Sequence, residues 1–161
     1  MTETCALCDR ESACQHDNKT EVWRFNCAQC GPYYITQDDK DDFLGDQSKR
    51  LKHHAKRLSL LVQEQYIRGL PPLYLQFTEG PYPNIDDARP ERAQTFLASQ
   101  WPSSFPERLD RALCNLCRLS SELDELGCHV PSERALPASL FAKTSEEAYY
   151  VTQALCESGY I

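Results

Sequence analysis

Two pairs of cysteines near the N-terminus constrain the fold of this chain more than any other feature. Two residues separate the members of each pair and eighteen separate the pairs, which gives the pattern C-x2-C-x18-C-x2-C. The four residues are Cys5, Cys8, Cys27 and Cys30. A two-residue spacer lets a tight turn direct both sulfur atoms at one ion, and two such turns complete a tetrahedron. The pattern therefore predicts one structural zinc ion held by four thiolates.

The residues around the pairs support this prediction. Gly31 follows the second pair, where such a turn often needs a positive φ that glycine adopts freely. Asp9 occupies the equivalent place after the first pair, and Asp tolerates this conformation better than most residues. Residues 22–26 alternate apolar and polar side chains, as a strand does, and residues 33–36 are typical of a returning strand. We therefore expect a zinc ribbon, a small β-hairpin knuckle, over residues 1–38.

Other roles for the cysteines are less consistent with the sequence. A thioredoxin-like centre needs its CxxC pair at the start of a helix within a βαβ unit, and this segment lacks one. A catalytic zinc needs an open coordination position, which four thiolates do not leave. Rubredoxin-like iron uses similar paired turns and stays an alternative. Cys14 and His16 lie between the pairs, and we expect a loop thiol and a solvated imidazole there, not ligands.

The segment 39–68 is predicted to form an amphipathic basic helix, because apolar residues recur there at helical spacing. Its candidate interaction surface consists of Lys49, Lys52, His53, Lys56 and Arg57. Such a stripe could meet a phosphate backbone or an acidic protein surface. The simpler interpretation, which we favour, is a solvated face balanced by the acidic run at 38–42.

Residues 69–90 are rich in proline and are predicted to connect the two halves of the chain, with a short strand at 73–77. Residues 91–161 are expected to form a helical, winged-helix-like domain, because helical segments are followed by Gly159 and the start of a strand. No basic residue occurs from Thr144 to Ile161, so this domain is expected to contact protein. Cys114 and Cys117 are predicted to pack in its core, without forming a second metal site with Cys128 and His129.

The charge of the whole chain limits its partners. Seventeen Lys and Arg residues against 24 Asp and Glu residues give a formal net charge of −7, which provides no global attraction to nucleic acid. The most apolar run, residues 58–62, is far too short to cross a bilayer, and the N-terminus carries no apolar signal segment. We therefore expect a cytoplasmic protein that does not contact membranes.

Most of the chain resembles the zinc-ribbon-plus-helical N-terminal regions of bacterial defence proteins, where such regions precede effector domains such as TIR-type NADases and nucleases. The resemblance rests on CALC, on CAQCGPYYIT, and on short matches at 57–59, 105–113 and 155–161. It implies the same four metal ligands and a regulatory role beside an effector. Because no nucleotide-binding or catalytic motif accompanies it, we expect either a region of a longer protein or a stand-alone partner.

Together these features predict an α+β, mostly helical fold in which a zinc ribbon precedes a winged-helix-like half. The expected function is a non-enzymatic zinc-binding sensor or adaptor that contacts a protein partner or an effector domain, with nucleic acid bound weakly if at all. The alternative is a nucleic-acid-binding regulator that combines the ribbon with the winged helix. A hydrolase is disfavoured, because no cysteine is paired with His53, His54 or His129 in a recognisable motif.

Overall fold

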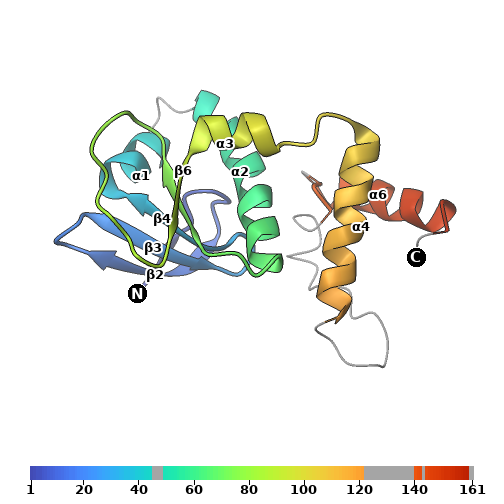
Figure 1. The fold of residues 1–161 in the computed structure, drawn as a ribbon, viewed down its shortest axis with the longest axis horizontal. Coiled ribbons are helices and arrows are strands. Elements are labelled where there is room, and N and C mark those ends of the chain that lie inside the picture. The colour runs from blue at the N-terminus through green and yellow to red at the C-terminus, as the bar shows by residue number, and fades with distance from the viewer. Residues whose placement is uncertain (45–48, 122–139, 143, 160–161) are drawn as a thin grey trace. The chain divides into compact units, whose positions relative to one another are not determined.

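The computed structural model describes residues 1–44, 49–121, 140–142 and 144–159 (Figure 1). The chain divides into two compact units, Met1–Trp101 and Pro102–Ile161. Among the described residues, no helix combines the length and the apolar character needed to cross a bilayer.

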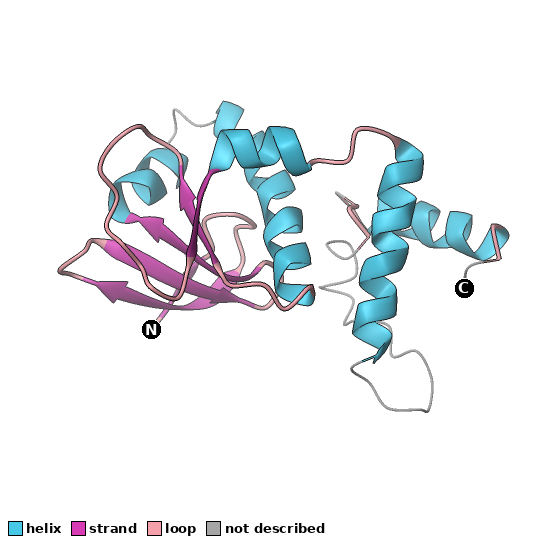
Figure 2. Ribbon diagram, in the orientation of Figure 1, coloured by secondary structure: helices cyan, strands magenta, loops and turns pink. Residues whose placement is uncertain are grey.

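The first unit is built on a sheet of six strands (Figure 2). They are β1 (Thr2–Thr4), β2 (Glu11–Asp17), β3 (Val22–Cys27), β4 (Gly31–Thr36), β5 (Leu73–Gln76) and β6 (Arg89–Arg92), and they lie in this order across the sheet. Strands β1 to β4 form an antiparallel meander, whereas β5 runs parallel to β4 and β6 runs parallel to β5. Two parallel neighbours need a long crossover connection. The connection from β4 to β5 contains helices α1 (Gln37–Leu44) and α2 (Lys49–Ile67).

Strands β3 and β4 are the two middle strands of the sheet, and both faces of the sheet are covered there. Helix α2 packs against β4, and helix α3 (Ala93–Gln100) packs against α2. The loop formed by residues 77–88 contributes apolar side chains to a second cluster, in which the buried members are Val22, Tyr34 and Tyr74. Alternate residues of a strand point to opposite faces of the sheet. Since both faces are covered, β4 is buried along most of its length.

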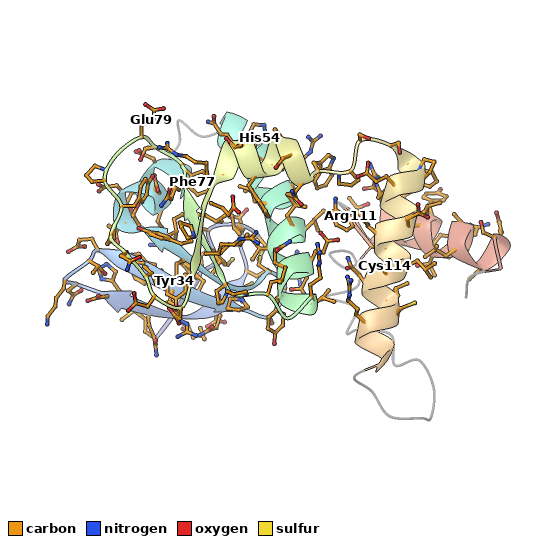
Figure 3. All side chains as sticks on the ribbon, viewed as in Figure 1. Tyr34, His54, Phe77, Glu79, Arg111 and Cys114 are labelled. Atoms are coloured by element: carbon orange, nitrogen blue, oxygen red, sulfur yellow. The ribbon has the colours of Figure 1, made fainter. Side chains whose placement is uncertain are left out.

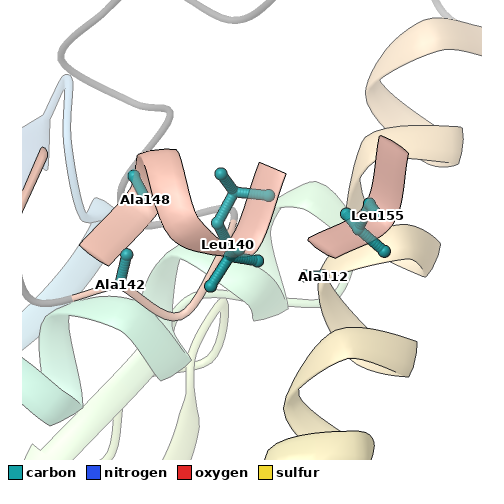
Figure 4. Close-up of a cluster of buried hydrophobic side chains, with 6 residues drawn as sticks. Ala112, Leu140, Ala142, Ala148 and Leu155 are labelled. Atoms are coloured by element: carbon teal, nitrogen blue, oxygen red, sulfur yellow. The ribbon is translucent and has the colours of Figure 1, made fainter. Parts of the chain in front are cut away.

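The second unit contains helices α4 (Phe105–Ser121) and α6 (Ser145–Glu157). Its hydrophobic core cluster contains Ala112, Leu140, Ala142, Ala148, Val151 and Leu155 (Figure 4). The Thr144 side chain caps α6 by accepting a hydrogen bond from the backbone N–H of Glu147, and Arg108 of α4 forms an ion pair with Glu147. The cap thus defines the start of α6, and the ion pair connects that start to α4.

The predicted fold class is wrong. The strands of the N-terminal region do not form a separate ribbon, because β5 and β6 extend the same sheet and α2 covers it. A segment of about 35 residues buries too little apolar surface alone, and here it obtains its core from later parts of the chain. The part of the second unit that the structure describes contains helices and no strand, so it gives the winged-helix prediction no support.

The division of the chain differs as well. The stretch 69–90, which the sequence marks as a connector, contains β5 and the start of β6, and the two units separate at Trp101 and Pro102. The segment 39–68 does not form one helix, since α1 ends at Leu44 and α2 begins at Lys49.

The predicted core role of two cysteines in α4 is wrong. Cys114 and Cys117 are exposed. The face of α4 that is fully buried carries Ala112 and Asn115, and the leucines at 109, 113 and 116 flank it. Cys128 and His129 lie outside the described residues.

Candidate metal centre

Two loops at one end of the meander carry the four paired cysteines. Cys5 and Cys8 lie between β1 and β2, Cys27 is the last residue of β3, and Cys30 directly precedes β4. In an antiparallel meander, the β1–β2 and β3–β4 connections lie at the same end of the sheet. The pairing of β2 with β3 therefore brings two loops that are distant in sequence next to each other.

Both loops contain the backbone conformation that the sequence predicts. Asp9 has φ of 59° and Gly31 has φ of 79°, so each pair is followed by a residue in the left-handed region. In the first loop, the N–H of Cys5 donates to the carbonyl of Arg10 at 2.7 Å, and the N–H of Asp9 donates to the carbonyl of Cys5 at 3.0 Å. These hydrogen bonds close a turn in which both sulfur atoms point the same way.

The four sulfur atoms form one compact cluster. All four lie within 4.8 Å of one another, with Cys5 Sγ at 3.7 Å from Cys30 Sγ and Cys8 Sγ at 3.5 Å from Cys27 Sγ. Four sulfurs around a tetrahedral zinc with bonds of about 2.3 Å would be about 3.8 Å apart. Cys5, Cys27 and Cys30 are buried and Cys8 is partly buried. The four cysteines can therefore hold a metal ion, and their spacing fits zinc.

Two buried hydroxyl groups contact the cluster from outside. Tyr33 Oη lies 3.1 Å from Cys5 Sγ, and Ser59 Oγ lies 3.0 Å from Cys30 Sγ. A hydroxyl group can donate to a thiolate and stabilise its charge, as the outer partners of metal ligands commonly do. Ser59 belongs to α2, so this contact also joins the helix to the cysteine loops.

Sequence analysis does not identify Ser59 as part of this centre. It lies 29 residues after Cys30, and no spacing rule relates the two. One signal was available: Ser59 is the only polar residue in the apolar run 58–62, and a buried hydroxyl needs a partner.

The pKa values of the four thiols are shifted in different directions. Hydrogen bonds from Cys30, Cys5 and Cys8 lower the pKa of Cys27. The pKa of Cys30 is raised because its thiol hydrogen-bonds to Cys27 and is buried. Burial also raises the pKa of Tyr33, so its hydroxyl stays protonated and can donate to a Cys5 thiolate. A metal ion would replace the thiol protons, and its affinity would fall as the pH falls.

The two candidate residues between the pairs do not join the cluster. Cys14 is buried in β2, where its Sγ lies 3.7 Å from the carbonyl oxygen of Met1. The His16 ring stacks on Trp23 with centroids 4.5 Å apart, and its Nε2 lies 3.4 Å from a carboxylate oxygen of Glu21. Both residues thus lie in a strand and pack against neighbours, in contrast to the expected loop thiol and solvated imidazole.

The predicted basic surface is only partly described. Lys56 is exposed, whereas the Arg57 guanidinium lies over the Trp101 ring at 4.9 Å from its centroid. The side chains of Lys49, Lys52 and His53 lie outside the described residues. Arg57 is therefore engaged in packing within its own unit.

Protein-family models, curated proteins and solved structures were each compared with this chain, and none of them matches it. The case for a function therefore rests on the four-cysteine centre and on the surfaces around it.

Proposed function

We propose that this protein is a non-enzymatic module in which a zinc ion, bound by Cys5, Cys8, Cys27 and Cys30, stabilises the fold, and which acts as a sensor or adaptor through contacts with another protein. The observation that carries this proposal is the closed four-sulfur cluster. Four thiolates fill the tetrahedral sphere of zinc and leave no position for water or substrate. The metal would therefore stabilise the protein and would not activate a reactant.

The amount of stabilisation is large compared with ordinary packing terms. Structural zinc in small peptides supplies about 10–16 kcal/mol of apparent binding free energy at neutral pH. Strand β1 has three residues, and the buried side chains of Ala6 and Leu7 anchor the Cys5–Cys8 loop beside the cluster. Zinc would thus hold the β1–β2 and β3–β4 loops together.

Charge supports a protein partner over nucleic acid. The net charge of −7 opposes phosphate binding. Arg57 stacks on Trp101, and the first turn of α6 carries Glu146 and Glu147. If duplex DNA binds at all, we expect dissociation constants of about 10⁻⁴–10⁻⁶ M near physiological salt. Nanomolar, sequence-dependent binding that persists at higher salt would support the regulator alternative.

An effector domain of a bacterial defence system is one class of partner that the sequence resemblance implies, and we include it in the proposal. Co-purification with the product of a neighbouring gene tests it. Stable association would support the adaptor role, and a neighbourhood without effector genes would remove this class of partner.

The metal is tested by elemental analysis of the protein purified without an affinity tag. We expect about one zinc per chain in the wild type, a loss of this zinc and of thermal stability in Cys27→Ser, and no change in the control Cys156→Ser, whose thiol is exposed and distant in sequence from the cluster. Iron in place of zinc would change the identity of the metal. Absence of metal, or full metal content in Cys27→Ser, would contradict the proposal.

A further inference from the structure

A groove with a volume of about 700 Å³ lies in the first unit, beside the β2–β3 hairpin. Its floor comes from β2, β3 and β4, and one wall comes from the loop 77–88 that connects β5 to β6. Tyr34, labelled in Figure 3, lies in this floor. The groove is distinct from the cysteine cluster, whose residues do not line it.

The wall of the groove is held in place by a buried carboxylate. Asp39 of α1 is 1% exposed and accepts hydrogen bonds from the N–H of Phe77, the hydroxyl of Thr78 and the hydroxyl of Tyr82 at 3.3, 3.1 and 2.8 Å. Ile85 and its neighbours pack on the cluster around Tyr34. The loop is therefore anchored at its start and at its middle.

The floor combines apolar surface with one cation that is paired. The Arg24 guanidinium lies over the Tyr34 ring at 5.5 Å and 3.9 Å from Asp87 Oδ2. The Tyr34 hydroxyl donates to the same Asp87 oxygen at 2.7 Å. Val22 and Ile85 supply apolar surface beside these groups. Asp87 Oδ1 receives neither of these two contacts.

The charges around the groove favour a cationic ligand. Asp17 and Asp87 line it, and two further carboxylates lie next to lining residues: Glu21 beside His16 at 3.4 Å, and Asp86, which accepts from Asn84 at 2.9 Å. Two cations lie in the same region, Arg24 beside Asp87 and Lys19 near Asp17, so with a neutral imidazole the four carboxylates leave an excess of two negative charges. An anion, including a phosphate backbone, would be repelled.

We propose that this groove binds an extended segment of a partner protein that carries a lysine or arginine side chain. The aliphatic stem of that side chain packs on Val22 and Ile85, and its charged head reaches the carboxylates of Asp17 and Asp87. The N–H groups of Arg24 that do not face Asp87 donate to a main-chain carbonyl of the segment. This inference rests on the proposed role in protein binding and names the chemistry of the partner.

The test is a titration of the full, metal-bound, ¹⁵N-labelled chain with three capped tripeptides: acetyl-Gly-Arg-Gly-amide, acetyl-Gly-Lys-Gly-amide and acetyl-Gly-Glu-Gly-amide. We expect the two basic peptides to shift amide resonances at 15–24, 34 and 84–87, and the acidic peptide to leave them unchanged. Equal or stronger binding of the acidic peptide, shifts elsewhere, or no shifts at millimolar peptide would overturn the proposal.

Matched variants sharpen the test. Asp87→Asn removes the charge and keeps an oxygen for the Tyr34 hydroxyl, so we expect about fivefold weaker binding of the basic peptides, whereas Asp42→Asn on the exposed surface of α1 should have no effect. If Asp87→Asn unfolds, the comparison of acidic and basic peptides on the wild type still tests whether the groove binds basic side chains. If the amide resonances of the groove residues shifted with protein concentration in the absence of peptide, the groove would bind a second copy of this chain. That result would refute the proposal of a different partner protein.

Failure here is separable from failure of the proposed function. A chain that contains its zinc and binds a partner protein but ignores the basic peptides loses only the groove assignment. A chain without metal loses the proposed function, whatever the peptides do.

Discussion

Removing the Ser59 hydroxyl tests whether α2 is part of the metal centre. Ser59 is 1% exposed and its Oγ lies 3.0 Å from Cys30 Sγ. Ser59→Ala deletes this donor and leaves the four sulfur ligands in place. Because alanine has a higher helix propensity than serine, the substitution does not weaken α2 itself.

The expected loss follows from the charge of the acceptor. A hydrogen bond to a charged group contributes about 1.5–3 kcal/mol, which corresponds to about 10–100-fold in affinity, the range found for outer partners of metal ligands. We therefore expect Ser59→Ala to bind zinc about 10–100-fold more weakly than the wild type. Tyr33 still donates to Cys5 at 3.1 Å, so the site should persist.

Competition with a chromophoric zinc chelator measures this affinity at fixed pH. Ser99→Ala is the control, because Ser99 is an exposed serine on α3 whose hydroxyl donates to the carbonyl of Phe96. The reasoning would be refuted if Ser59→Ala released zinc at the wild-type chelator concentration, or if Ser99→Ala lost affinity equally.

Two further substitutions probe the supports of the sheet. Gly31→Ala should lower the free energy of unfolding by about 2 kcal/mol or more, because φ is 79° and the new Cβ would lie 2.8 Å from Tyr66 Cβ; an unchanged midpoint in urea would contradict this. Asp39→Ala should leave the donors of Thr78 and Tyr82 without their buried acceptor, at a cost of about 1–3 kcal/mol each at most. Amide exchange should then accelerate at 77–88 before it does in β3, and uniform acceleration would argue against a local anchor.

The cysteine loops could be predicted from the sequence because their geometry is local. Two residues between thiols and a residue that tolerates positive φ after each pair are properties of short segments, and Asp9 and Gly31 do adopt that conformation. For Ser59 the sequence shows only that a polar residue interrupts the apolar run 58–62. Its contact with Cys30 could not be predicted, because it depends on how α2 crosses the sheet.

The sheet was missed for a different reason. The strand predicted at 73–77 is found as β5, but β6 was not predicted, because it has four residues and contains Pro90, a residue typical of the first turn of a helix. Proline is tolerated in an edge strand, where its missing N–H removes no bond from a central ladder, and β6 is such an edge. In α4, the spacing of the leucines predicts a buried face centred on them, whereas the fully buried residues are Ala112 and Asn115.

The metal centre and the groove are connected through strand register. Cys27 pairs with Gly31 at one end of the β3–β4 ladder, and the same register places Arg24 opposite Tyr34, the pair in the floor of the groove. A slip of one residue would move every side chain of a strand to the opposite face. A zinc ion on the two cysteine loops would oppose that slip, because Cys27 and Cys30 would be fixed to one ion. A metal with a purely structural role would in this way preserve the surface that we propose for recognition.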